Sequence, residues 1–273
     1  MAAASSNPAF NNSPVFTTKA VVNSTTLNGK TMTPSELDEL YGRPSATPTD
    51  TDRMTYEDTI MKIVIAFGIL LVGAVVGWMI PVVAIPAAIV GFVLALVNIF
   101  KKKPSAPLVL AYGAAQGIFV GGISRLIEAN FEGIIYQALL GTGIVFGVTL
   151  ALFASGRIRA SKRATKIFMI AMISYALFSV VNLVLQFTGV STDPWGLASE
   201  PVPFIGIPFG LIIGPLAILL GAYSLVLDFT AVQEGVRTGA PRSWGWKAAF
   251  GIVLTIIWLY VEILRLLSII RGD

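Results

Sequence analysis

A glutamate inside the last long apolar stretch of the chain is the residue whose position most strongly indicates chemistry. The stretch runs from Trp246 to Ile270, and Glu262 lies past its middle. About 25 residues, at 1.5 Å rise per residue, are enough to cross a bilayer with some tilt. A carboxylate at that depth has little water around it, so it should face other helices and mark a functional site. The simpler alternative is a pair with Arg265, three residues later, that points both side chains toward the far interface.

Three other ionisable residues lie at the ends of apolar stretches. Asp228 follows Ser224 to Leu227, Lys101 follows Phe100, and Arg125 lies three residues before Glu128. Each has an ordinary interpretation when it is considered alone. Asp228 then lies in hydrated headgroups, Lys101 anchors the cytoplasmic side, and Arg125 pairs locally with Glu128.

The composition excludes several classes of protein. The 273 residues are 55% hydrophobic and 12% charged, with no cysteine and no histidine, and the mean hydropathy is +0.78. These values are typical of an integral membrane protein. Without histidine or cysteine the chain lacks the usual general base, thiol nucleophile and transition-metal ligands, which excludes His-dependent hydrolases and most zinc sites. We expect no enzyme, no cofactor and no defined metal site. The net charge of +4 comes from basic loops between apolar stretches, which does not indicate nucleic-acid binding.

Seven apolar stretches predict an all-α membrane protein with seven transmembrane helices. Their approximate ranges are 60–80, 82–100, 106–127, 134–155, 167–187, 204–228 and 246–270. Residues 1–53 are rich in Ser, Thr, Asn and Pro and are predicted to form a disordered cytoplasmic tail, so 54–273 is the transmembrane domain. A six-helix arrangement with a re-entrant last segment is the alternative, and the length of that segment argues against it.

Local signals add detail to this plan. Thr55 to Asp58 has the Thr-x-x-acid form of a capping box, and Lys62 lies near enough the interface to extend toward water. Glycines recur every four residues, which predicts close helix packing, and Pro208 with Pro215 predicts a bent sixth helix. The glycine motifs are Gly113-x3-Gly117-x3-Gly121, Gly143-x3-Gly147 and Gly206-x3-Gly210-x3-Gly214.

Lysine and arginine are distributed unevenly between the loops. Three follow the second stretch, five lie between the fourth and fifth, and three lie around the loop before the seventh, whereas Arg125 is alone in the opposite set. Basic residues favour the cytoplasmic side. The sequence therefore predicts a multi-pass protein of the cytoplasmic (inner) membrane with a cytoplasmic N-terminus and an external C-terminus.

The order of these features resembles that of a known family. An aspartate closes the sixth stretch, a basic cluster closes the second, and Leu259-Tyr260-Val261-Glu262 lies inside the seventh. Together with seven spans, this is similar to the Bax inhibitor-1 family (transmembrane Bax inhibitor motif, YccA-like), over roughly 54–273. The Asn- and Ser-rich tail resembles that of the actinobacterial branch.

The resemblance implies a fold with a central last helix and a pH-sensitive cation (calcium) leak. In that family a sixth-helix and a seventh-helix carboxylate form a proton-sensitive pair, and a basic residue at the end of the second helix closes the pathway. Carried over by position, the pair is Asp228 and Glu262, and the latch is Lys101 or Lys102. The chain departs from the pattern in three ways: its seventh-helix acid is Glu, its latch is Lys, which lacks the planar fork of Arg, and the loop between the acids is longer. If the last helix is straight, the two acids meet only if its first turns lie outside the bilayer or it tilts strongly.

Other functions remain to be weighed. YccA-like relatives suggest a non-transporting regulator that binds other membrane proteins, such as a membrane protease, with the tail as a binding segment. An intramembrane di-acid protease needs two aspartates in motifs that Leu227-Asp228 and Val261-Glu262 do not match. A retinal protein needs a lysine in the middle of the last helix, and Lys247 lies at its start. The expected partners are the lipid bilayer, protons, cations including Ca²⁺, and other membrane proteins.

Overall fold

The computed structural model describes residues 26–27, 30–31, 52–190, 193 and 195–272. The chain divides into two compact units, 1–47 and 48–273, which are described separately. In the first unit, β1 (Thr26–Leu27) pairs antiparallel with β2 (Lys30–Thr31). The rest of the predicted tail, up to residue 51, lies outside the described residues.

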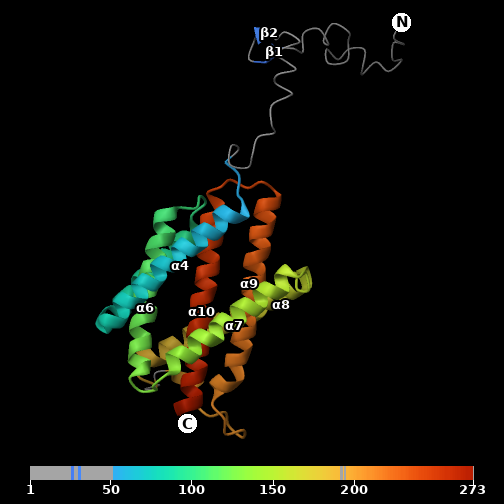
Figure 1. The fold of residues 1–273 in the computed structure, drawn as a ribbon. Helices are drawn as coiled ribbons and strands as arrows, with labels where there is room; N and C mark the ends of the chain where they lie inside the picture. The colour runs from blue at the N-terminus through green and yellow to red at the C-terminus, as the bar shows by residue number, and fades with distance from the viewer. Residues whose placement is uncertain (1–25, 28–29, 32–51, 191–192, 194, 273) are drawn as a thin grey trace. The chain divides into compact units, whose positions relative to one another are not determined.

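The described part of the second unit is built from helices (Figure 1). Seven of the helical segments there are long and apolar enough to cross a membrane, which confirms an all-α, multi-pass integral membrane protein. The elements are α4 (Tyr56–Met79), η1 (Pro81–Val83), α5 (Ala84–Phe100), α6 (Ala106–Glu128), α7 (Ile134–Ala154), α8 (Lys162–Phe187), η2 (Gly196–Ala198), α9 (Phe209–Arg237) and α10 (Trp244–Gly272).

Helix starts follow local capping rules. The Thr55 hydroxyl accepts a hydrogen bond from the Asp58 backbone N–H at 3.2 Å, which confirms the predicted cap of α4. Ser161 caps α8 in the same way through the Ala164 N–H. The Glu128 carboxylate accepts from the Gly133 and Ile135 N–H groups at 2.7 and 3.1 Å, and so stabilises the positive end of α7.

Helix α10 is the centre of the bundle, as expected. It packs against α9, α4, α7 and α6, and Figure 1 shows α7 crossing it. In its most apolar window 67% of the residues are buried, against 6% for α8. Helices α4 and α5 expose many large apolar side chains, which is the surface that a lipid-facing helix requires.

The α4–α6 contact depends on glycine. A Cβ atom on Gly117 would overlap the backbone carbonyl of Leu70, and one on Gly121 would overlap that of Ala74. From the other side, Gly77 lies against the carbonyl of Ile118. Without side chains the two backbones approach directly, as the four-residue spacing on α6 predicted.

Two other glycine predictions need correction. Gly143 and Gly147 on α7 have nothing within 4 Å of an added Cβ, so this motif does not pack against another described helix. Gly206 lies before α9 with φ +76° and is not part of the helix. Gly210 and Gly214 do face α10, near Ile269 and Leu266. The motif spacing alone could not show which glycine faces had a neighbour.

The sixth span also begins and ends later than predicted. Pro208 precedes α9, and Pro215 lies inside it, where its ring nitrogen cannot donate a helical hydrogen bond. The helix continues past Asp228 to Arg237. Asp228 therefore lies within α9, although we predicted that it would end this span.

Candidate functional site

Glu262 lies in a buried polar cluster between α10 and α8. Its side chain accepts hydrogen bonds from Tyr175 Oη and, at 3.2 Å, from Trp258 Nε1, both at Oε1. Arg265 Nη2 donates to Oε2 at 2.6 Å. Glu262 is 4% exposed and Arg265 8% exposed. The Glu262–Arg265 pair proposed as the simpler alternative does form, but it is buried among helices.

One hydrogen-bond donor of this cluster has no acceptor in the described part of the chain. Among the residues that the structure describes, Arg265 Nε is a buried side-chain nitrogen with no hydrogen-bond partner. The guanidinium carbon lies 5.9 Å from the centroid of the Tyr175 ring, which adds a cation–π contact. Removing one member of a buried ion pair leaves the other charge unpaired, so Glu262 and Arg265 stabilise the fold only together.

Asp228 lies in a second polar cluster between α9 and α10. Thr255 Oγ1 donates to Asp228 Oδ2 at 2.8 Å, and Ser224 Oγ lies 3.3 Å from Thr255 Oγ1. A Cβ on Gly251 would lie 2.9 Å from Asp228 Oδ1, so glycine leaves room for the carboxylate. No lysine or arginine among the described residues forms a salt bridge with Asp228. The cluster gathers one carboxylate and two hydroxyl oxygens.

The structure does not bring Asp228 and Glu262 into contact. Asp228 lies nine residues before the end of α9. In an antiparallel helix pair it therefore faces α10 residues a similar distance after Trp244, which are Gly251 and Thr255. Glu262 lies seven residues beyond Thr255, or about 10 Å along the helix. The two acids form separate clusters in this conformation, which corrects the expected direct pair.

The predicted latch residues lie at the end of α5. Lys101 caps this helix, and both Lys101 and Lys102 are exposed. Neither forms a salt bridge with a described carboxylate. Lys247 of α10 instead donates to the carbonyl oxygens of Asn98 and Ile99, at 3.3 and 3.2 Å. The latch role of Lys101 or Lys102 stays a prediction, while Lys247 makes the observed link between α5 and α10.

A third charged cluster joins the start of α4 to the α9–α10 loop. Arg242 Nη2 lies 2.7 Å from Asp58 Oδ1, and Lys62 binds both Asp58 and, at 2.6 Å, the carbonyl of Arg242. Lys62 is 7% exposed and lies 5.7 Å from the Trp246 ring centroid. The interaction with Asp58 raises the pKa of Arg242 above its usual value. Lys62 is thus buried in an ion network, although we predicted that it would extend into water.

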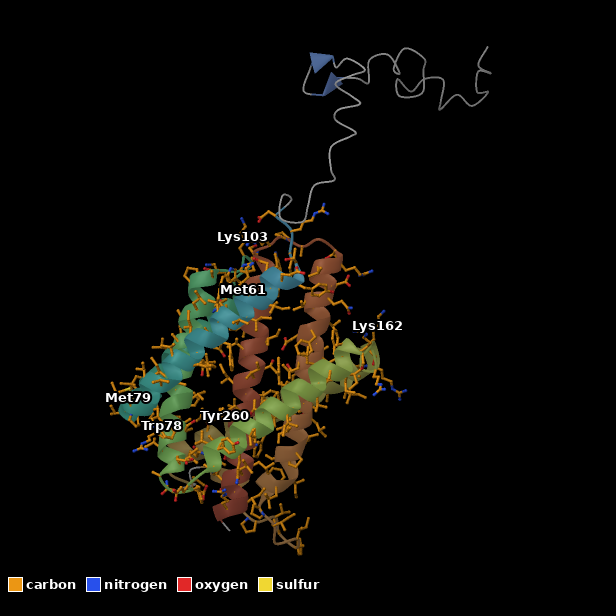
Figure 2. The ribbon with its side chains drawn as sticks, in the orientation of Figure 1. Met61, Trp78, Met79, Lys103, Lys162 and Tyr260 are labelled. Atoms are coloured by element: carbon orange, nitrogen blue, oxygen red, sulfur yellow. The ribbon has the colours of Figure 1, made fainter. Side chains whose placement is uncertain are left out.

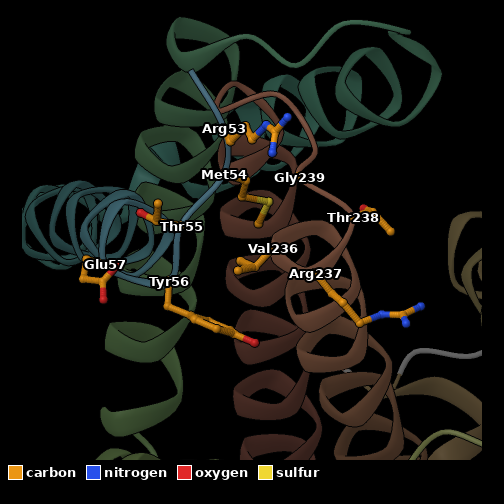
Figure 3. A pocket seen from close by; sticks show the side chains of 9 residues that line it. All are labelled: Arg53, Met54, Thr55, Tyr56, Glu57, Val236, Arg237, Thr238 and Gly239. Carbon is orange, nitrogen blue, oxygen red and sulfur yellow. The ribbon is translucent and has the colours of Figure 1, made fainter. Parts of the chain in front are cut away.

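The backbone ahead of α4 pairs with the same loop. Met54 N donates to Ala240 O at 2.7 Å, and Arg242 N donates to Asp52 O at 2.8 Å. A cavity of about 360 Å³ lies beside this pairing, and Figure 3 shows the Arg53 and Arg237 side chains around it. Figure 2 shows Met61 and Lys103 toward one end of the bundle and Trp78 toward the other.

Sequence reasoning missed several residues that complete these clusters. Tyr175, Thr255 and Lys247 each meet a partner on another helix, and no local pattern marks such a meeting. Trp258 is different, because it lies four residues before Glu262 on the same helix. That spacing could have identified it.

Comparison with known proteins places the chain in a family. No curated protein and no solved structure matches it. The family model for Bax inhibitor 1 like proteins matches residues 7–272. This match covers more of the chain than the region of 54–273 expected from the motifs, and it includes most of the N-terminal segment. The chain therefore belongs to the Bax inhibitor 1 like family.

Proposed function

We propose that the protein is a pH-sensitive cation leak whose pathway follows α10 past Asp228 and Glu262. The observation that carries the proposal is the environment of Asp228. This half-buried carboxylate receives a hydroxyl hydrogen bond and has no described cationic partner. Such a site can hold a proton or a cation, and an intramembrane carboxylate is typical of ion pathways.

The ligand chemistry favours a hard cation. The Asp228 carboxylate and the hydroxyls of Thr255 and Ser224 offer oxygen atoms only, and oxygen ligands suit Ca²⁺ and similar ions. Ca²⁺ is the cation that the family resemblance suggests. Even with both carboxylate oxygens, these protein oxygens are fewer than Ca²⁺ prefers, so the ion would keep water ligands and bind weakly, as a leak requires.

Glu262 and Arg265 form the second element of the pathway. Arg265 places a positive charge in the protein interior, 2.6 Å from Glu262. Because Arg265 already neutralises Glu262, this acid is not free to hold a mobile cation in the conformation described here. The conformation described here is therefore the closed state, and conduction requires this pair or its neighbours to rearrange.

The basic loops set the proposed orientation. The loop that contains Arg157 to Lys166, the loop after α5 and the α9–α10 loop face the cytoplasm, because they hold most of the lysine and arginine. The N-terminus then lies in the cytoplasm and the C-terminus outside, in the cytoplasmic membrane. Asp228 lies closer to the cytoplasmic end of α10 than Glu262 does.

Cation flux into liposomes across a pH series tests the proposal. Asp228→Asn and Glu262→Gln keep side-chain size but remove a titratable group, so each should flatten the pH dependence of flux. Glu57→Gln is the matched control, because Glu57 is an exposed carboxylate at the start of α4. If both buried variants keep the wild-type pH profile, the proposed leak mechanism is wrong.

A non-transporting regulator is the second candidate. The observation in its favour is that the Gly143 and Gly147 face of α7 is exposed with no described neighbour, and such a face can accept a partner helix. Gly143→Leu should then reduce capture of a membrane-protein partner while leaving cation flux unchanged. Flux that is absent from the wild type in liposomes would favour this candidate.

A further inference from the structure

Helix α8 is attached to the bundle by few side chains. Phe168 is its only buried residue. Near its start, Thr165 Oγ1 lies 3.0 Å from Tyr223 Oη of α9. In its middle, the hydroxyl of Tyr175 donates to Glu262 of α10. Weakly packed elements are the ones that move at low cost.

Tyr175 occupies an oxygen of Glu262 to which Arg265 could donate a second hydrogen bond. Glu262 Oε1 already holds two donors, Tyr175 Oη and Trp258 Nε1, whereas Oε2 holds Arg265 Nη2. Arg265 Nε is left without a partner among the described residues. A buried N–H without an acceptor destabilises this arrangement relative to one that satisfies it.

The same chain shows what an unhindered pair of this kind does. Glu234 and Arg237 have the same three-residue spacing on α9. There Arg237 Nε donates to one carboxylate oxygen at 2.9 Å and Nη2 to the other at 2.8 Å. The spacing therefore permits a complete two-bond fork on a helix. At Glu262 the fork is half formed, and the oxygen that would complete it is the one that Tyr175 and Trp258 occupy.

We propose that Tyr175 and Arg265 Nε compete for Glu262 Oε1, and that this competition sets whether α8 is docked on α10. In the docked state, which the structure shows, Tyr175 holds the oxygen and Arg265 Nε is unpaired. In the undocked state Tyr175 leaves, Arg265 completes the fork, and the α8 side of α10 opens. Each state satisfies one donor and leaves the other, so their free energies are close and small changes shift the population.

The role of this switch in conduction rests on the proposed function. Undocking of α8 opens the side of α10 that carries Glu262, while Glu262 and Arg265 stay paired in both states. Tyr175 is thus a positioning residue for the gate. The docking equilibrium is a property of the helices and can be measured without flux.

Distance measurements between spin labels test the docking equilibrium. The chain has no native cysteine, so Leu126→Cys on α6 and Val180→Cys on α8, both at exposed positions, label the full-length protein in lipid nanodiscs. Tyr175→Phe removes the hydroxyl but keeps the ring. It should raise the ratio of undocked to docked molecules about threefold or more, the effect of an average interhelical hydrogen bond in a membrane.

Two further variants test the direction in which the docking equilibrium should shift. Trp258→Phe removes the other donor to Oε1, so Arg265 Nε can bond there while Tyr175 remains, and this variant should favour the docked state. Arg265→Lys keeps the charge but cannot form the fork, so it should favour the docked state. In an Arg265→Lys background the effect of Tyr175→Phe should be larger, because no fork can then form to offset part of the lost Tyr175 hydrogen bond.

The controls separate competition from general loosening. Ser174→Ala removes an exposed α8 hydroxyl that bonds only its own helix at Ile170 O, and it should leave the distances unchanged. Tyr223→Phe removes the α9 hydroxyl that meets Thr165 of α8, and its effect should not depend on residue 265. Equal distances in Tyr175→Phe and Ser174→Ala overturn the inference. So does an effect of Tyr175→Phe that is independent of residue 265.

Flux of the same variants separates this inference from the proposed function. Shifted distances with unchanged flux support the docking switch and refute its role in conduction. A flat pH profile in Asp228→Asn with unshifted distances in Tyr175→Phe supports the leak and refutes the switch.

Discussion

Thr255 of α10 donates a hydrogen bond to Asp228 of α9 at 2.8 Å, across the contact between the two helices. The hydroxyl and the carboxylate form one cluster, while Glu262 lies about two helical turns farther along α10. The two acids that the family resemblance pairs directly therefore lie at different levels along α10, with Asp228 contributed by α9 and Glu262 by α10 itself. This arrangement makes their effects separable.

Asp228→Asn and Glu262→Gln should have additive effects on the free energy of unfolding. Substitutions at separate sites without shared partners usually add within about 0.5 kcal/mol, and no described hydrogen bond joins the two clusters. Thermal unfolding in detergent of the single and double variants measures this. A strongly non-additive double variant would instead show that the acids act as one unit, as a directly contacting pair does.

Thr255→Val should lower the stability of the α9–α10 contact by about 0.6 kcal/mol, the average for an interhelical hydrogen bond in a membrane. The matched control is Thr142→Val, because the buried Thr142 hydroxyl bonds Ala138 of its own helix. Thermal unfolding of both variants gives the comparison. An equal loss in the two would mean that Thr255 contributes nothing specific to Asp228.

Glycine positions on α9 and α7 should tolerate leucine very differently. A Cβ on Gly210 would lie 2.8 Å from the Ala198 carbonyl, whereas Gly143 has nothing within 4 Å. Gly210→Leu should therefore reduce the yield of folded protein several-fold, and Gly143→Leu should not. Size-exclusion chromatography of the purified variants measures the folded fraction. Comparable yields would place the α9 glycines against lipid.

Substitution of Lys101 and of Lys247 should have different effects, because Lys101 is the predicted latch and Lys247 makes the observed link between α5 and α10. If Lys101 is the latch, Lys101→Ala raises flux at neutral pH and Lys247→Ala does not. The hydrogen bonds of Lys247 to Asn98 and Ile99 favour a structural link there, so Lys247→Ala should mainly lower stability. Flux and unfolding temperature of both variants, with exposed Lys103→Ala as a control, decide between the two roles.

Single cysteines at Ser161 and Asn130 should be labelled from opposite sides of the membrane. Both positions are exposed, and Ser161 belongs to the most basic loop, which is predicted to be cytoplasmic. An impermeant thiol reagent added to intact cells should label Asn130→Cys and spare Ser161→Cys. The reverse pattern would invert the proposed topology.

The parts of the fold that could be predicted from sequence depend on local properties. Apolar length defined the seven spans, and the Thr55 cap followed from residues three apart. The α6 glycine ridge was correct because α4 packs there, whereas the same spacing on α7 has no neighbour. Spacing shows that small residues line one face of a helix, and only the tertiary structure shows which element packs against that face.

The sequence identified the two acidic residues of the candidate site but not the residues that each of them contacts. Asp228 and Glu262 were found because acids are rare in apolar helices. Their partners were missed because each lies on another helix: Tyr175 of α8 binds Glu262, and Thr255 of α10 binds Asp228 of α9. The separation of the acids follows from the register between α9 and α10, which depends on where both helices end.

The backbone pairing between residues 52–54 and 240–242 sets a limit on truncation of the N-terminus. Deletion of residues 1–51 keeps the Asp52 carbonyl that accepts from Arg242 and the Met54 amide that donates to Ala240. Deletion through Arg53 removes the first of these bonds and leaves the Arg242 N–H without its acceptor. Hydrogen–deuterium exchange at the Arg242 amide should therefore stay slow in the shorter deletion and become fast in the longer one. A truncation that preserves this pairing therefore ends no later than residue 51.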